Sequence, residues 1–199
     1  LDQGSYGLKY DLYTSLLDGS LYWFEGYHHW PGIGLADFRL DSATMEPSLL
    51  EIREMPYRIR MAGLDISLPF NAWVLRAEAA WQQSDAEPGE SEIIPFPEIA
   101  YTAELEYTAG KLTLLGGYYG KYILDYTDPV AEPALTVDRE KFTQIMQQPP
   151  GPVPTDPGEM IRQQLGAFNR LYNYQMEQWY HSVFLLATRQ FFHQQLEIT

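Results

Sequence analysis

A sustained alternation of apolar and polar residues between Ala72 and Tyr126 limits the folds open to this chain more than any other feature. In the stretch 73–81 the odd positions are Trp, Leu, Ala, Ala and Trp, whereas the even positions include Arg76 and Glu78. The stretches 98–107 and 112–126 repeat this pattern. Because successive side chains of a strand point to opposite sides of a sheet, a period of two predicts one apolar and one polar face.

The rest of the chain extends the same pattern. Asp18-Gly19 predicts a short hairpin turn, and the parity slips at Ala62-Gly63, where a glycine bulge would restore the register. Four further strands and the start of an eighth are predicted at 6–16, 21–30, 57–68, 171–187 and 194–199.

The predicted connections alternate between short turns and long loops. The long loops are 31–56, 83–97 and 127–170, and the last contains two candidate helical segments. Residues 138–148 are compatible with one or two helical turns. Asp156 followed by Pro157 predicts an N-cap and a first helical position, opening a short helix that runs to about Phe168.

Composition excludes several classes of function. The chain has 199 residues and no cysteine, so disulfides, thiolate zinc sites and cysteine nucleophiles are excluded. Its net charge of −14 argues against a nucleic-acid partner, because neutralising phosphates needs a basic surface. No apolar run approaches the roughly 18 residues of a spanning helix, but a barrel strand crosses a bilayer in about 9–11 alternating residues.

The strand patterns at 57–66 and 116–122 are similar to those of porin-like outer-membrane β-barrels of Gram-negative bacteria. The resemblance covers nearly the whole chain but rests on a repeating pattern. It implies an all-β, antiparallel up-and-down transmembrane barrel, or part of one, with about eight strands. We therefore expect residues 1–199 to form one barrel segment in the bacterial outer membrane, with the lipid bilayer and small solutes as partners. The oligomeric state is left open.

The end of the chain departs from this family pattern. Such barrels usually close on an aromatic residue, whereas this chain ends with Glu197-Ile198-Thr199. We therefore expect seven full strands and part of an eighth, belonging to a larger barrel.

Charged residues on the polar side of the predicted strands are the candidate pore lining. A Lys or Arg facing lipid near the midplane would cost about 2–4 kcal/mol, so charges of one parity require water or mutual pairing. Their acidic excess predicts a mild cation preference; alternatively, pairs such as Arg76 with Glu98 or Glu104 fill the lumen and close it. The predicted pore-lining residues are Lys9, Asp11, Glu25, Arg58, Arg60, Asp65, Arg76, Glu78, Glu98, Glu104, Glu106, Lys121, Asp125 and Glu177.

Aromatic residues near the ends of the strands predict two girdles on the lipid side. Tyr and Trp favour membrane interfaces, where one end of the side chain is apolar and the other is wet. The alternative interpretation of these positions is that strands simply favour aromatic residues. The predicted membrane-facing girdle comprises Tyr22, Trp30, Trp73, Trp81, Tyr107 and Tyr126.

Patterns that resemble enzyme or metal motifs have simpler explanations. His28 and His29 are adjacent, so on a regular strand they point to opposite faces and are poorly placed to hold one metal ion. His181-Ser182 has the same problem as a catalytic pair, although a lipase of the outer membrane is an alternative. We expect no enzyme activity, no metal and no cofactor.

Two further patterns are weighed in the same way. Glutamates 98, 104 and 106 could mimic an acid–base pair, but solvated pore charges explain them more simply. Glycines 116, 117 and 120 lie within a strand and therefore do not form a phosphate loop; they would permit curvature or close packing of tyrosine rings.

Several interpretations remain open from the sequence. The loop 127–170 either docks inside the lumen and narrows it or lies over the mouth. The leading function is a porin-like channel for passive or facilitated diffusion. The alternatives are a soluble β-barrel that binds an apolar ligand and the barrel portion of a TonB-dependent receptor.

Overall fold

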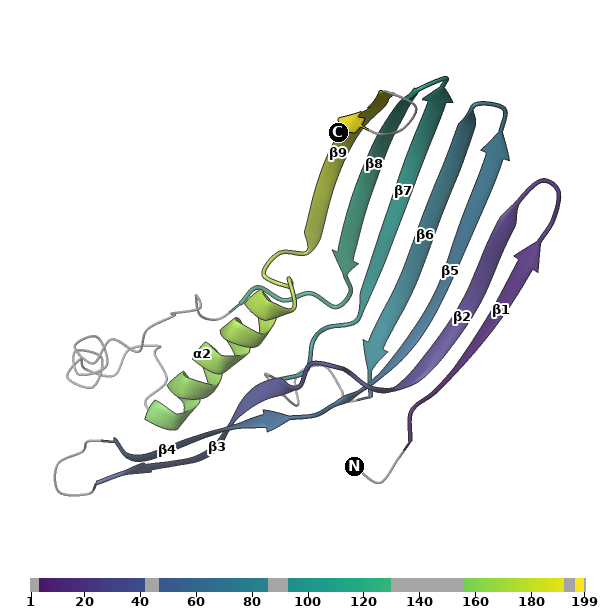
Figure 1. The fold of residues 1–199 in the computed structure, drawn as a ribbon. Helices are drawn as coiled ribbons and strands as arrows, with labels where there is room; N and C mark the ends of the chain where they lie inside the picture. Colours follow the sequence, from purple (N-terminus) through teal and green to yellow (C-terminus); the bar gives the residue numbers. More distant parts are fainter. Residues whose placement is uncertain (1–3, 42–46, 86–92, 130–155, 192–195, 199) are drawn as a thin grey trace.

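The computed structural model describes residues 4–41, 47–85, 93–129, 156–191 and 196–198. Within these ranges the chain forms one large antiparallel sheet, a separate two-stranded hairpin and one helix (Figure 1). The predicted all-β fold is therefore confirmed in strand content and direction.

The large sheet has eight strands in the order β1-β2-β5-β6-β7-β8-β9-β10, and every neighbouring pair is antiparallel. Strands β1 and β10 are its edges and are not paired with each other in the described part of the chain, so the sheet is open. Its strands are β1 (Tyr6–Tyr13), β2 (Asp18–Tyr27), β5 (Arg58–Phe70), β6 (Trp73–Ser84), β7 (Glu98–Ala109), β8 (Leu112–Ile123), β9 (Trp179–Phe191) and β10 (Leu196–Ile198).

Short and long connections alternate between the two ends of the sheet, as predicted (Figure 1). Two-residue turns join β5 to β6 and β7 to β8; each begins at a positive φ, 56° at Asn71 and 61° at Gly110. The first turn differs from the expectation at Asp18-Gly19, because these residues already belong to β2. Instead, the Thr14 hydroxyl holds the turn by donating to the Leu17 carbonyl oxygen at 2.8 Å.

The long connection between β2 and β5 contains a hairpin that periodicity did not predict. Strands β3 (Gly32–Leu40) and β4 (Pro47–Met55) pair in a sheet of their own. An irregularity between Leu35 and Asp37 shifts the register. This shift breaks the period of two, and for this reason the sequence pattern conceals the hairpin.

Helix α2 (Pro157–Tyr172) lies beside the hairpin, toward the long-connection end of the sheet (Figure 1). Its predicted start is confirmed: the Asp156 side chain accepts a hydrogen bond from the Gly158 backbone N–H at 2.9 Å, and Pro157 is the first helical residue. The helix is longer than predicted, so the expected strand at 171–187 begins only at Trp179. The helical turns considered at 138–148 lie outside the described residues.

The bulge predicted at Ala62-Gly63 is not formed. Ala62 pairs with Trp23 and Trp81, and Gly63 pairs with Tyr22 in an unbroken register. Arg58 and Arg60, whose position suggested the slip, simply occupy the apolar parity at the end of β5.

Cross-strand pairing divides the sheet into two faces. We call the side that carries Asp65, Glu78 and Glu104 the polar face, and the side that carries Leu64 and Leu105 the apolar face. One register row crosses the apolar face through Leu8, Trp23, Ala62, Trp81, Ile99, Tyr122 and Trp179.

The hairpin tips are staggered relative to this row. The strands reach five residues beyond it in β1 (to Tyr13), eight in β5 (to Phe70), ten in β7 (to Ala109) and twelve in β9 (to Phe191). The stagger therefore grows by seven residues from β1 to β9, across six strand spacings. With about 3.3 Å per residue and about 4.8 Å between strands, this corresponds to a tilt of about 39°.

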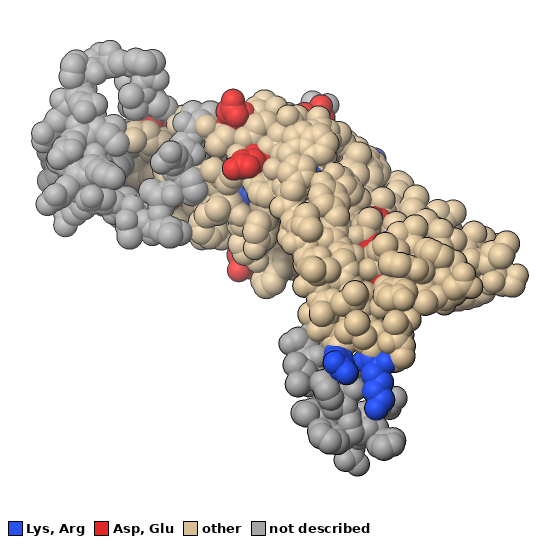
Figure 2. Space-filling model, turned by 90° about the horizontal axis from the view of Figure 1, so that it is seen from above, with Lys and Arg blue, Asp and Glu red and all other residues tan. Residues whose placement is uncertain are grey.

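In the large sheet, burial of residues other than glycine is confined to the long-connection end. Ile59, Ser84, Lys121 and Ile123 are buried there, all on the polar face, and Tyr57 is buried beside them. Over the rest of the sheet large apolar side chains remain exposed, and the surface seen from above is mostly uncharged (Figure 2). A single sheet has no second layer against which to bury its apolar side.

Candidate functional site

The polar face brings together nine of the predicted pore-lining residues. It carries seven carboxylates against three basic groups, an excess of four negative charges. The carboxylates are Asp11, Asp18, Asp65, Glu78, Glu98, Glu104 and Glu106, and the basic residues are Lys9, Arg76 and Lys121. That these residues line a pore stays a prediction.

The charges in the open part of this face are only partly paired. Arg76 donates to Glu106 at 2.8 Å, although Glu104 is its direct cross-strand neighbour. Asp65 lies directly opposite Glu78, and like charges in such positions repel each other. Asp65 accepts a hydrogen bond from Ser20 at 3.2 Å, and Glu78 accepts one at 3.1 Å from the Tyr22 hydroxyl. Carboxylates arranged in this way require hydration.

Glycines directly opposite aromatic residues shape both faces. A Cβ at Gly63 would lie 2.2 Å from the Tyr22 ring, so Tyr22 extends across β5 toward Glu78. Phe184 covers Gly117 on the polar face and Tyr101 covers Gly120 on the apolar face in the same way. The expectation that strand glycines permit close packing of rings is thus confirmed for Gly117, against a phenylalanine, and for Gly120; Gly116 has no contact closer than 3.9 Å.

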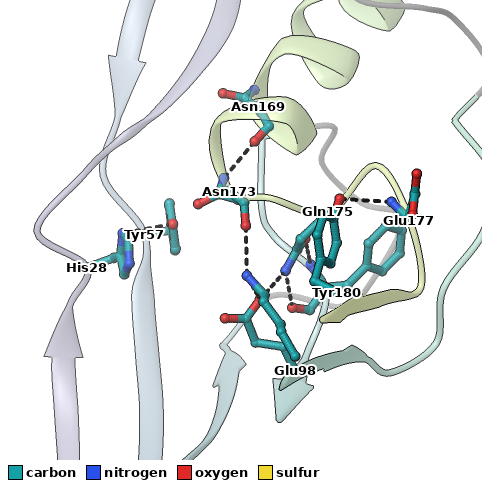
Figure 3. A network of polar contacts seen from close by, with 10 residues as sticks. His28, Tyr57, Glu98, Asn169, Asn173, Gln175, Glu177 and Tyr180 are labelled. Atoms are coloured by element: carbon teal, nitrogen blue, oxygen red, sulfur yellow. Dashed lines mark hydrogen bonds and ion pairs between the residues drawn. The ribbon is translucent and has the colours of Figure 1, made fainter. Parts of the chain in front are cut away.

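At the long-connection end, the polar face meets a cluster of polar side chains (Figure 3). The Lys121 ammonium lies 2.6 Å from Glu98 Oε2 and donates to the Asn173 carbonyl oxygen at 2.8 Å. Gln175, which is fully buried, donates from Nε2 to the same Glu98 oxygen at 2.7 Å. The cluster therefore joins two sheet strands to the segment that follows α2.

Two side-chain amides imitate strand pairing in this region. Gln175 accepts from the Phe96 N–H at 2.8 Å and donates to the Phe96 carbonyl oxygen at 3.0 Å. Asn169 makes the same two contacts with Ile33, at 3.0 and 2.8 Å. Each amide thereby satisfies both backbone groups of one residue, in the connection before β7 for Phe96 and in strand β3 for Ile33.

We refer to residues 93–97 and 169–178 together as the base cap. Arg170 donates to the Thr127 carbonyl oxygen at 2.6 Å and lies over the Phe96 ring at 4.6 Å. Burial lowers the pKa of the Arg170 guanidinium. Tyr126 donates to the Met176 carbonyl oxygen at 2.6 Å, and burial raises the pKa of its hydroxyl. These contacts join the two parts of the cap to each other and to the residues that follow β8.

Five predicted pore-lining residues lie elsewhere. Glu25, Arg58 and Arg60 occupy the apolar parity at the long-connection end, where they form an ion-pair cluster with Asp85 at 3.2–3.6 Å. The sequence prediction assigned them to the wrong face, because a charged residue at the end of a strand can be hydrated or paired on either face. Asp125 and Glu177 lie outside the strands, in the connection between β8 and β9.

The predicted aromatic girdle is corrected in the same way. Trp73, Trp81 and Tyr107 lie on the apolar face, and their contact with lipid stays a prediction. Tyr22 lies on the polar face. Trp30 and Tyr126 lie in connections rather than on strands, and Trp30 packs edge-on against the Tyr172 ring with centroids 5.9 Å apart. The sequence prediction missed Trp23, which lies on the apolar face.

The apolar face has far more exposed large hydrophobic side chains than the polar face. Those on the polar face are Tyr13, Tyr119, Phe184 and Leu186. Those on the apolar face are Tyr6, Leu8, Tyr10, Leu12, Leu21, Trp23, Leu64, Ile66, Phe70, Trp73, Leu105, Leu112, Leu114, Trp179, Val183 and Leu185.

The histidine pair lies in the connection after β2, not on a strand as expected. The rings of His28 and His29 are 4.8 Å apart, so they do not diverge. His28 Nδ1 lies 2.8 Å from the Trp30 carbonyl oxygen and 2.9 Å from the Tyr57 hydroxyl. Burial lowers the pKa of His28 and raises that of Tyr57. Among the described residues no three His, Cys, Asp or Glu side chains are grouped to hold a metal ion.

The second histidine motif is divided between the faces. His181 lies on the apolar face with Nδ1 2.7 Å from the Tyr118 hydroxyl, whereas Ser182 lies on the polar face. The two side chains therefore cannot act as a catalytic pair.

Comparison with protein-family models, characterised proteins and solved structures finds no match for this chain. In the described ranges, no helix has the length and apolar character needed to cross a membrane.

Proposed function

We propose that this chain forms part of the wall of a porin-like β-barrel in the bacterial outer membrane. Its polar face lines a water-filled passage for small solutes, and its apolar face contacts lipid. The observation that carries this proposal is the exposed apolar face, which extends across the sheet from β1 to β9. An apolar surface of this extent requires a covering, and lipid is the covering that suits a regular alternation of faces.

The stagger of the hairpin tips supports a barrel rather than a flat sheet. Strands of a transmembrane barrel tilt by roughly 35–45° from its axis, and the tilt requires a steady shift in register. The shift of seven residues across six strand spacings gives about 39°. Further strands would have to pair with β1 and β10 to close the ring.

The distribution of aromatic and charged residues fits the thickness of an apolar band. Trp73 and Trp81 are eight residues apart on one strand, or about 26 Å along it and about 20 Å along the axis of a barrel tilted by 39°. Outer-membrane barrels have an apolar band about 25 Å tall, flanked by aromatic residues. The cluster of Glu25, Arg58 and Arg60 lies beyond this band, at the level that would meet headgroups.

The polar face supports a preference for cations. The excess of four negative charges on this face attracts counter-ions. Asp65 and Glu78 lie directly opposite each other, so both carboxylates require hydration. Arg76 is paired with Glu106, so this basic group does not offset the remaining carboxylates. We therefore expect a mild selectivity for cations.

The base cap argues against a soluble barrel that encloses an apolar ligand. Such a barrel would place the apolar face inside and the polar face in bulk water. The long connection after β8 instead folds back against the polar face, where Asn173 accepts from Lys121 and Gln175 donates to Glu98. A connection that folds into the lumen of a barrel would contact the polar face in this way.

Extraction and conductance together test the proposal. We expect the complete barrel that contains this chain, with the strands that close the ring, to stay with membranes until detergent is added, and then to produce stepwise conductance in planar bilayers. In a KCl gradient, the reversal potential should give a K⁺/Cl⁻ permeability ratio above one. Release without detergent would refute the membrane assignment, absence of conductance would refute the channel, and a ratio below one would refute the acidic lining.

A further inference from the structure

Three polar side chains lie together on the apolar face, on the adjacent strands β7, β8 and β9. The Tyr118 hydroxyl lies 2.7 Å from Nδ1 of His181, and the ring centroids of Tyr101 and Tyr118 are 5.9 Å apart. The register row that contains Tyr101 and His181 continues through the apolar residues Ala79 and Leu64. We refer to Tyr101, Tyr118 and His181 as the polar island.

Gly120 allows the side chains of the polar island to approach one another. It is the direct cross-strand neighbour of both Tyr101 and His181. The Tyr101 ring and hydroxyl occupy the space in which a Cβ at Gly120 would lie, so Tyr101 extends over β8. The Trp179 ring stacks on the imidazole of His181 with centroids 5.6 Å apart and an interplanar angle of 15°. Trp179 and Tyr118 therefore fix the orientation of an imidazole that remains exposed.

The polar island lies at the level where the apolar band of the proposed barrel ends. Gly120 is eight residues from Leu112, and His181 is ten residues from Phe191, which are the ends of these strands at the short turns. With a strand tilt of about 39°, these separations are about 20 Å and about 26 Å along the axis. An apolar band about 25 Å tall that begins at the short turns gives way to lipid headgroups at this level.

We propose that the polar island binds the phosphate of a membrane phospholipid, an inference that rests on the proposed contact of the apolar face with lipid. When the Tyr118 hydroxyl donates to Nδ1 of His181, the imidazole proton lies on Nε2, which then acts as a donor. The Tyr101 hydroxyl provides a second donor at the same place. Phosphate oxygens suit these donors, because hydrogen bonds to an ionised acceptor are roughly twice as strong as neutral ones.

The side chains between the polar island and the short turns suit the acyl chains of the same lipid. Val183 and Leu185 follow His181 on the apolar face of β9 and are 78% and 81% exposed. A phospholipid whose phosphate is held at the island would lay its acyl chains over these residues and bury their apolar surface. Free phosphate would gain no such contact, so the site selects a lipid.

Native mass spectrometry of the complete barrel that contains this chain, in a non-ionic detergent, tests the site with two probes. Dioleoylphosphatidylglycerol carries the phosphate, whereas dioleoylglycerol has the same acyl chains without it. We expect the wild-type protein to bind the phospholipid about tenfold or more tightly than dioleoylglycerol. His181→Phe keeps the ring stacked on Trp179 but removes the donor, so it should weaken phospholipid binding about tenfold and leave dioleoylglycerol unaffected.

Tyr10→Phe is the matched control. Tyr10 lies on the apolar face of β1 in the same register row as His181, so the variant loses a hydroxyl far from the island. It should change phospholipid binding by less than about twofold. Equal losses in Tyr10→Phe and His181→Phe would overturn the site. If His181→Phe does not fold, Tyr118→Phe decides: we expect binding to weaken about threefold or more, and unchanged binding overturns the inference.

The remaining outcomes separate the site from its ligand and from the proposed function. Displacement of the phospholipid by excess inorganic phosphate would show that the island binds free phosphate, which would overturn the lipid assignment. A wild-type protein that leaves membranes without detergent refutes the lipid contact and the site together. A wild-type protein that needs detergent but binds both probes equally refutes only the site.

Discussion

Lysine substitutions at neighbouring positions of β7 provide a direct test of which face meets lipid. Ala103 lies on the apolar face in a row with Ala77 and Ile66, midway between the Trp73–Tyr107 pair and the Trp81–Ile99 pair. Glu104 is adjacent in the chain but lies on the polar face. Ala103→Lys and Glu104→Lys therefore introduce the same group about 3.3 Å apart along the strand, on opposite sides of the sheet.

The expected difference is large. A lysine near the midplane of a lipid-facing strand costs about 2–4 kcal/mol, whereas near the interface the cost is about 0–1 kcal/mol. Ala103→Lys should therefore lower the ratio of folded to unfolded protein roughly 30- to 900-fold. Leu112→Lys, at the short-turn end of the same face, should lower it by less than about fivefold. Glu104→Lys should be nearly neutral, because water covers the polar face.

Reversible urea unfolding in lipid vesicles, followed by tryptophan fluorescence, measures these free energies. The lipid assignment requires that the cost of lysine differ between the two faces of the strand and that it decline toward the strand end. Equal costs for Ala103→Lys and Glu104→Lys would refute the assignment of lipid to the apolar face. A cost as large at Leu112 as at Ala103 would refute the position of the apolar band.

Three further predictions concern the stability of the fold. Gly63→Ala should destabilise by about 1–3 kcal/mol in urea unfolding because the new Cβ displaces the Tyr22 ring, whereas Gly116→Ala should have little effect; equal effects would refute this packing. Asp156→Ala should cost about 1 kcal/mol through loss of the helix N-cap, and an Asn substitution should largely restore the stability. Burial depresses the pKa of His28, so the unfolded chain binds the proton more readily and stability should fall as pH drops below about 6.5. His28→Gln should flatten this decline in unfolding measured between pH 5 and 8, and an unchanged slope would contradict it.

The strands of the large sheet were predictable because their signals are local. Alternation in β6 and β7 and the turns at Asn71 and Gly110 require no knowledge of distant residues. Pairing of neighbours then follows from the short turns. The order of the sheet could be expected for the same reason, apart from the hairpin inserted between β2 and β5.

The face of β2 could not be predicted, because its middle is apolar at both parities. Leu21 and Trp23 lie on one side, whereas Tyr22 and Phe24 lie on the other. Glu25 was taken as the marker of the polar face, but it lies near the strand end, where its ion pairs and not the face determine its position. A charged residue indicates which face of a strand is polar only when it lies in the middle of the strand.

The base cap was the least predictable part of the candidate site. Gln175 comes from the irregular segment after α2 and Asn169 from the last turns of the helix, and their partners at Phe96 and Ile33 are backbone groups that any residue could provide. Lys121 was predicted to lie on the polar side, and the register agrees. Its enclosure with Glu98 depends on a connection of 55 residues, from 124 to 178, folding back, which no local pattern encodes.

The glycines opposite aromatic rings have a consequence for the room available beside the wall. Because Tyr22 and Phe184 lie over Gly63 and Gly117, each ring adds only its thickness to the polar side of the sheet instead of its full length. In the proposed channel, a passage bounded by this wall would keep its width despite bulky side chains, and solutes would meet ring faces as well as carboxylates.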